Sequence, residues 1–171
     1  TDKTGTLTEG KLSVESYVDA ELNTYKNINN LSTKNYELIY QSLVYNNASF
    51  LNNGIPEGGN TTDRAILSYI GNDDKTKYKI LKVEEFNSKL KYSSVETNYN
   101  NSTLFIKGAY EKVIEKCTKY HKKDGTVRVL IDKKNIENYI NVKTSEGKRA
   151  LALAYKDNSS NGYILLGFIF L

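Results

Sequence analysis

The chain has 171 residues, of which 39% are hydrophobic and 26% charged, a balance typical of one folded domain rather than of a disordered segment. One cysteine excludes an internal disulfide and a cysteine-rich zinc site, and one histidine excludes a multi-histidine metal site. The net charge of +4 is mild and the basic residues are scattered, so we expect no nucleic-acid partner.

No apolar run approaches the roughly 20 residues that span a bilayer, so we do not expect the chain as given to insert into a membrane. The chain contains no methionine, and we expect it to be a piece of a longer protein.

The first half of the chain predicts loops around two helices. Residues 1–10 are polar, residues 11–18 alternate like a strand or an extended connector, and the Asn-rich residues 21–34 predict a loop. One helix is predicted by apolar side chains at helical spacing, namely Tyr36, Ile39, Tyr40 and Leu43. Residues 52–59 hold the only proline and predict a loop. A second helix follows, with Thr61 or Thr62 as its cap, Gly71 at its end, and a buried face of Ala65, Ile66, Tyr69 and Ile70.

The second half predicts mostly strands, over residues 78–86, 92–97, 103–107, 150–155 and 163–171. Short helices are predicted over residues 109–117 and after Asp132, and Asp124-Gly125 predicts a tight hairpin turn. Because several strands are joined by hairpin-length links, we expect an α+β fold in which an antiparallel β-sheet is flanked by helix pairs.

A motif near the start offers a possible nucleophile, in the string Asp2-Lys3-Thr4-Gly5-Thr6-Leu7-Thr8. A carboxylate such as Asp2 can accept a phosphoryl group covalently, which divides hydrolysis of a phosphoanhydride into two steps. Mg²⁺ and fixed donors must then neutralise the transferring group, and the turn that follows can supply backbone donors and hydroxyls. A polar terminal loop is the alternative for this string on its own.

Four later residues lie at the ends of predicted elements. Asp63, near a helix start, can accept a hydrogen bond from an exocyclic amine, and Phe86, at a strand end, can offer one ring face to a base. Lys107 ends another strand before Gly108, which lets the backbone approach a ligand, and Arg149 leads a further strand. Taken singly, these residues are also compatible with a helix cap, a core aromatic, an exposed lysine and a salt bridge.

Together these motifs resemble those of the P-type ATPases, the ion pumps that pass through an aspartyl-phosphate. The first string is similar to the family's phosphorylation signature, and residues 62–66 are similar to its Thr-Glu-x-Ala-Leu helix start. Residues 86–95, 107–111 and 149–154 resemble Phe-x-Ser-x-x-Lys-x-x-Ser-Val, Lys-Gly-Ala-Pro-Glu and Arg-x-Leu-Ala-x-Ala. This combination is most similar to the calcium-pump-like group.

The resemblance implies the cofactors ATP and Mg²⁺ and a set of site residues. The nucleotide-binding residues it implies are Asp63, Phe86, Lys91, Lys107, Gly108 and Arg149, with the base stacked on Phe86 and the charged tail held by Lys107 and Arg149. The catalytic residues it implies are Asp2 as phosphoryl acceptor, Lys3 and Thr4. Asp2 and Thr4 would hold Mg²⁺ together with the rest of the phosphorylation domain.

The resemblance also implies the domain organisation. Residues 1–10 would belong to the phosphorylation domain, 11–18 to a hinge, 19–166 to the nucleotide-binding domain and 167–171 to a return hinge. The partners it implies are ATP and the phosphorylation, actuator and transmembrane domains of the same pump chain. The location it implies is the cytoplasmic side of the cell membrane. We expect the fragment alone to bind ATP without turnover.

Two alternatives stay open. A non-catalytic nucleotide-binding or interaction module can keep the same fold. A soluble phosphatase with an Asp nucleophile usually carries a second Asp two residues later, where this chain has Thr4. Heavy-metal pumps use a Ser-Glu-His-Pro motif that the surroundings of His121 do not match, and we expect His121 at the surface.

Overall fold

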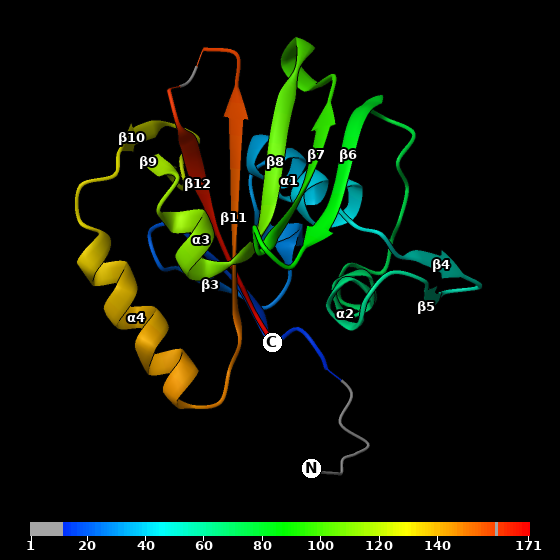
Figure 1. Ribbon diagram of the computed structural model, residues 1–171, viewed down its shortest axis with the longest axis horizontal. Coiled ribbons are helices and arrows are strands. Elements are labelled where there is room, and N and C mark those ends of the chain that lie inside the picture. Colours follow the sequence, from blue (N-terminus) through cyan, green and yellow to red (C-terminus); the bar gives the residue numbers. More distant parts are fainter. Residues whose placement is uncertain (1–11, 160) are drawn as a thin grey trace.

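The computed structural model describes residues 12–159 and 161–171, and it has the predicted α+β architecture (Figure 1). The helices are η1 (Ile28–Asn30), α1 (Thr33–Tyr40), the π-helix η2 (Gln41–Tyr45), α2 (Thr61–Ile70), η3 (Tyr99–Asn101), α3 (Tyr110–Ile114) and α4 (Lys133–Ser145). The strands are β2 (Ser16–Asp19), β3 (Thr24–Tyr25), β4 (Phe50–Asn52), β5 (Ile55–Glu57), β6 (Ile80–Asn87), β7 (Tyr92–Thr97), β8 (Thr103–Ala109), β9 (Cys117–His121), β10 (Val127–Val129), β11 (Ala150–Asp157) and β12 (Tyr163–Phe170).

Nine of the described strands form one sheet. Its main path is β10-β9-β12-β11-β8-β7-β6, and β2 with β3 is added along β12. Every pairing is antiparallel except that of β9 with β12. The predicted antiparallel sheet is therefore confirmed, and residues 16–18 of the predicted connector belong to its strand β2.

One face of the sheet is covered by α1, η2 and α2. The apolar stripe of α1 and η2, with Leu38, Ile39 and Leu43, packs against Phe105 and Leu153 from the middle strands. All five side chains are at most 2% exposed. Burying each such side chain contributes roughly 1.5–3 kcal/mol, so this layer fixes the position of both helices on the sheet.

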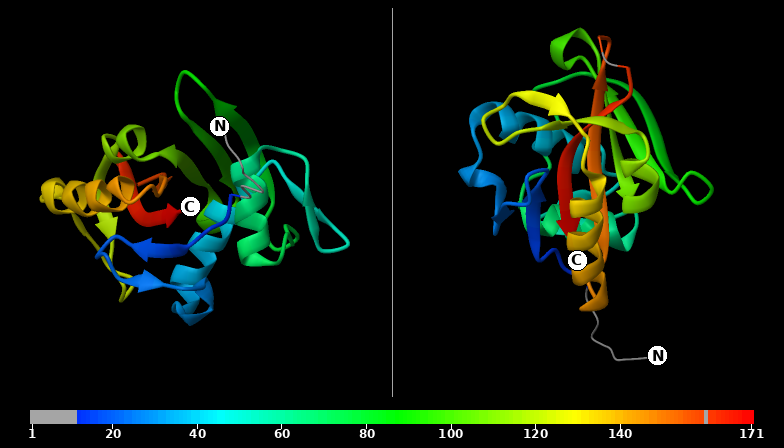
Figure 2. Two further views of the ribbon diagram at one scale, coloured as in Figure 1. Left: turned by 90° about the horizontal axis from the view of Figure 1, so that it is seen from below. Right: turned by 90° about the vertical axis from the view of Figure 1, so that its left-hand side faces the viewer.

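The opposite face is covered by α3 and α4, which lie across the sheet from α1 (Figures 1 and 2). Ile136 and Ile140 of α4 and Val113 of α3 pack there against Ile106 and Phe168. Phe105 and Ile106 are neighbours in β8, and because side chains alternate along a strand they contribute to opposite cores.

Local signals account for most helix ends. Gly71 ends α2 with φ 75°, a left-handed conformation that glycine adopts at no steric cost, as predicted. Asp132 caps α4 by accepting from the backbone N–H of Asn135. The cap of α2 is Asn60 rather than Thr61 or Thr62, because its side chain accepts from the N–H of Asp63 at 2.8 Å. Asparagine is as good a cap as serine or threonine, so the prediction was wrong by one residue.

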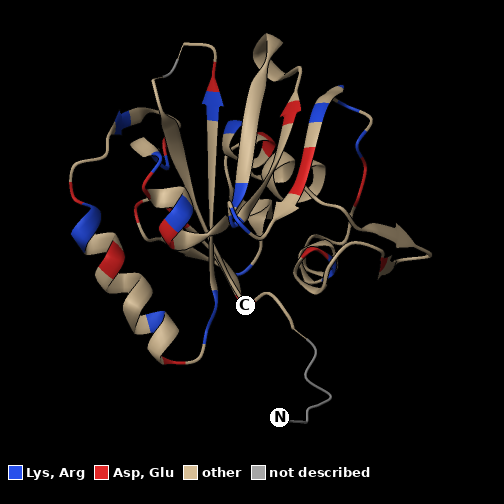
Figure 3. Ribbon diagram, viewed as in Figure 1, with Lys and Arg blue, Asp and Glu red and all other residues tan. Residues whose placement is uncertain are grey.

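The predicted loop at residues 52–59 contains β5 and the last residue of β4, which form a separate two-stranded hairpin with Pro56 in β5. A short exposed strand tolerates proline because nothing needs its missing N–H on the outer side. No helix of the described residues has the length and apolar character needed to cross a membrane. Figure 3 shows acidic and basic residues interspersed along α4 and β6, which agrees with the scattered charge of the sequence.

Candidate functional site

Phe86 lies near the end of β6, with 53% of its surface exposed. Val83 and Phe86 both border a cavity of about 380 Å³, although residues three apart in a regular strand face opposite sides of a sheet. The register of β6 with β7 shifts between Glu84 and Asn87, so three steps along β6 match two along β7. Such a β-bulge can change where a side chain points, and Phe86 borders the cavity together with Asn60 and Asp63 at the start of α2.

A second cavity, of about 240 Å³, brings most of the predicted binding residues together. Its lining is Asn60, Thr62, Asp63, Phe86, Ser93, Lys107, Gly108, Arg149 and Leu151. It shares four of these with the first cavity, namely Asn60, Asp63, Phe86 and Ser93. The two cavities therefore form adjoining parts of one groove along the Phe86 ring, of a size that suits a small ligand.

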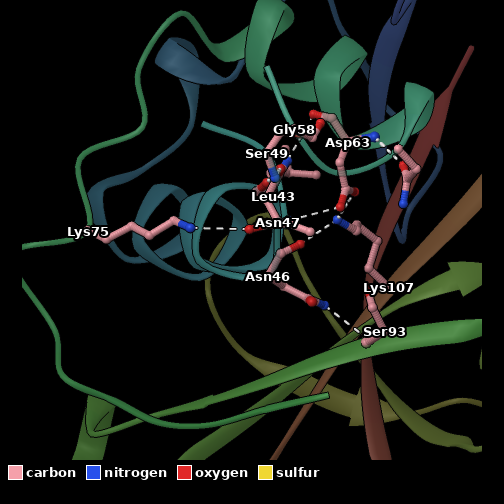
Figure 4. A network of polar contacts seen from close by, with 11 residues as sticks. Leu43, Asn46, Asn47, Ser49, Gly58, Asp63, Lys75, Ser93 and Lys107 are labelled. Carbon is pink, nitrogen blue, oxygen red and sulfur yellow. Dashed lines mark hydrogen bonds and ion pairs between the residues drawn. The ribbon is translucent and has the colours of Figure 1, made fainter. Parts of the chain in front are cut away.

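Lys107 and Asp63 form an ion pair in the wall of this groove (Figure 4). The Lys107 side chain is 4% exposed, and its Nζ lies 2.8 Å from Oδ1 of Asp63. Nζ also donates to the carbonyl of Asn46, while Oδ2 of Asp63 accepts from the N–H of Ala48 at 2.9 Å. Burial lowers the pKa of the Lys107 ammonium, and the Asp63 carboxylate opposes that change because it favours the charged form.

Gly108 lies in β8 close to the backbone of Lys91 and Tyr92 at the start of β7. A Cβ at this position would lie 2.3 Å from the carbonyl oxygen of Lys91 and 2.5 Å from Cα of Tyr92. Only glycine fits so close to a neighbouring backbone. The carbonyl of Lys91 also accepts from the N–H of Ala109 at 3.0 Å. Lys91 itself is exposed and lines neither part of the groove. It is therefore the one predicted nucleotide-binding residue, among those the structure describes, that lies apart from the groove.

Arg149 immediately precedes β11 at one end of the smaller cavity. Its backbone exchanges two hydrogen bonds with Leu171, at 2.9 and 3.0 Å, which fixes the residue beside the end of β12. Its side chain is exposed and forms no ion pair with any described residue. A guanidinium placed in this way can bind an anion bidentately.

The lining residues that were not predicted from the sequence include Asn60, Ser93 and Asn46. Asn60 could have been found, because a good cap residue immediately precedes the helix. Ser93 and Asn46 carry no local signal, since they reach the site only through the pairing of β7 with β8 and through the end of η2. The amide of Asn46 donates to the carbonyl of Ser93 at 3.1 Å and joins these two residues.

The predicted catalytic residues Asp2, Lys3 and Thr4 lie outside the described residues, and so does the predicted Mg²⁺ site. Within residues 12–159 and 161–171, no group of three or more His, Cys, Asp or Glu side chains could hold a metal ion. The prediction for His121 was wrong, because this residue is only 4% exposed and is enclosed by α1 and β11.

Comparison with known proteins identifies the family to which the chain belongs. The family model for the cytoplasmic domain N of P-type ATPases matches residues 34–165. The chain belongs to this family. A calcium-transporting ATPase of Bacillus cereus is 32% identical over 94% of this chain. A plasma membrane-type calcium-transporting ATPase of Oryza sativa subsp. japonica is 32% identical over 99% of it. A protein of Arabidopsis thaliana with the provisional name of a plasma membrane-type calcium-transporting ATPase is 35% identical over 92% of it.

This N domain spans less than a fifth of the length of these relatives, between 17% and 19%. The resemblance of its motifs to calcium-pump-like P-type ATPases is thus confirmed at the level of the family. The groove beside Phe86 lies within the matched residues.

Proposed function

We propose that this N domain binds ATP in the groove beside Phe86. The base stacks on the exposed face of the Phe86 ring, and the phosphates extend toward Arg149, which has no competing ion pair among the described residues. The observation that carries the proposal is that one cavity borders both an exposed aromatic ring and this guanidinium. Gly108 lines the same cavity, and its lack of a side chain lets β8 lie close to the backbone of Lys91 and Tyr92.

We propose further that the whole protein is a membrane cation pump, with calcium as the transported ion, as the names of its relatives suggest. Phosphoryl transfer depends on positioning and charge neutralisation. In this proposal the N domain delivers ATP to Asp2, whose carboxylate accepts the γ-phosphoryl group while its bond to the β-phosphate breaks and ADP leaves, with Lys3 and Thr4 close by. Mg²⁺ would be held by Asp2 and Thr4 with the remainder of the phosphorylation domain, and would neutralise charge on the transferring group.

The test of ATP binding is Phe86→Ala. Stacking of a base on an aromatic ring contributes roughly 1–3 kcal/mol, so this change should weaken the binding free energy of ATP by that amount. With one stacked base and exposed polar contacts, we expect the starting affinity near the millimolar range, or about −4 kcal/mol. An NMR titration of the chain with ATP measures both values.

Phe50→Ala is the matched control, because Phe50 is 50% exposed on the β4–β5 hairpin and lines neither part of the groove. It should leave the ATP affinity unchanged. An equal affinity in Phe86→Ala and the unchanged chain would place the nucleotide elsewhere.

A further inference from the structure

The Lys107 ammonium is already satisfied by groups of the protein. An ammonium has three donors, and one meets Oδ1 of Asp63 at 2.8 Å while a second meets the carbonyl of Asn46. Its charge is balanced by the Asp63 carboxylate and by the negative end of the helix that Asn46 closes. An anionic ligand therefore meets little net charge at this point of the groove.

We infer that Lys107 is a positioning residue, which acts through Asp63 and Asn46 to hold the walls of the groove and does not bind the phosphates. This inference rests on the proposed binding of ATP in the groove. It extends the positioning role to Asn46. This residue precedes the β4–β5 hairpin and is distant from Lys107 in sequence, although the two are in direct contact.

The contacts of Asn46 explain how the effect reaches the ligand. The residue ends the π-helix η2, and its N–H donates to the carbonyl of Gln41 at 3.0 Å. The extra residue in such a turn is a frequent feature of functional sites. The carbonyl of Asn46 accepts a hydrogen bond from Nζ of Lys107. Its side-chain amide donates to the carbonyl of Ser93, which lies opposite Lys107 in the β7–β8 pair. The end of η2 is thus bonded to both strands below the groove.

Asp63 links the same ammonium to the other wall. Its carboxylate also accepts from the N–H of Ala48, and its own N–H is held by the cap residue Asn60. Asn60, Asp63 and Ser93 each line both parts of the groove. Loss of the Lys107 ammonium would remove the contacts that tie Asp63 of α2 and Asn46 at the end of η2 to β8, and would alter the shape of the groove around the base.

The experiment compares ATP with adenosine, which has the same base and sugar but no phosphate, by NMR titration of the chain. Lys107→Met should lower the affinity for both ligands by a similar factor, about fivefold, because a less ordered groove binds every ligand less well. Arg149→Met should weaken ATP about tenfold and leave adenosine unchanged, because it removes a charged hydrogen bond to phosphate.

Lys75→Met is the matched control. Lys75 donates to the neighbouring carbonyl of Asn47 at 3.2 Å, but it lines neither part of the groove, so both affinities should stay the same. If Lys107→Met does not fold, the double variant Lys107→Met, Asp63→Asn removes both buried charges together and avoids leaving one of them unpaired. The ratio of ATP to adenosine affinity should again equal that of the unchanged chain.

The inference would be overturned if Lys107→Met, or the double variant with Asp63→Asn, lost affinity for ATP but not for adenosine, because Lys107 would then bind phosphate. Unchanged affinities for both ligands in folded Lys107→Met would overturn it too, because the residue would then have no effect on the ligand. An unchanged chain that binds neither ligand would overturn the proposed function, and this inference with it.

Discussion

The ring of His121 is held by two neutral partners in the interior. Nε2 lies 2.6 Å from Oδ1 of Asn35 in α1, and Nδ1 lies 3.2 Å from the hydroxyl of Tyr155 in β11. The neutral ring satisfies both contacts if Nε2 carries the proton, donates to Asn35 and leaves Nδ1 to accept from Tyr155. Burial, helped by the nearby Lys34 ammonium, lowers the pKa of His121 to about 4, from its usual value of 6.5.

This shift predicts how stability depends on pH. Between pH 4 and 6.5 the unfolded chain binds a proton that the folded chain does not, so the free energy of unfolding falls as the pH is lowered through that window. From pH 7 to pH 5 the loss should be about 2 kcal/mol. Urea unfolding at the two pH values measures it.

His121→Gln is the control, because glutamine does not titrate and the chain has no other histidine. This variant should lose much less stability between pH 7 and pH 5. A variant with the same pH dependence as the unchanged chain would show that the proton binds to another group.

Individual elements differ in how far their sequence determines them. The helix α2 and the hairpins β7–β8 and β9–β10 were predicted, because caps, turn residues and apolar spacing are local signals. The bulge at Phe86 was not, because it depends on the register with β7. The prediction for His121 failed for the same reason. A histidine among lysines is expected at the surface, and the partners that bury it, Asn35 and Tyr155, come from distant segments of the chain.

The close contact of β7 with β8 gives a prediction at this scale. Gly108→Ala should destabilise the domain by about 3 kcal/mol, because its Cβ would meet backbone atoms of Lys91 and Tyr92 that cannot move without separating the strands. Gly147→Ala is the comparison. That site has φ +88° but no atom within 4 Å of the added Cβ, so it should cost only about 1 kcal/mol, from the backbone conformation alone. Urea unfolding of both variants measures the difference, and equal losses would mean that β7 and β8 can move apart.

In the molecule as a whole, the first and last described strands lie side by side. β2 pairs with β12, and the N–H of Glu15 donates to the carbonyl of Phe170 at 2.7 Å. The Glu15 carboxylate also lies 2.8 Å from Nζ of Lys148, next to Arg149 in sequence. Leu171 pairs with Arg149 itself, so Glu15 and Leu171 both lie close to the end of the groove where Arg149 lies.

The same arrangement predicts that binding and phosphoryl transfer can be separated. A chain of residues 12–171 should bind ATP as well as the full 171 residues do, to within about twofold, because the described lining of the groove lies between residues 46 and 151. Neither chain should form a phosphoenzyme with radiolabelled ATP and Mg²⁺. The shorter chain lacks Asp2, and under the proposed function Asp2 accepts the phosphoryl group only together with the rest of a phosphorylation domain. A large loss of affinity on truncation would assign part of the nucleotide site to residues 1–11. Labelling of the longer chain that Asp2→Asn abolishes would show that the fragment carries out the transfer alone.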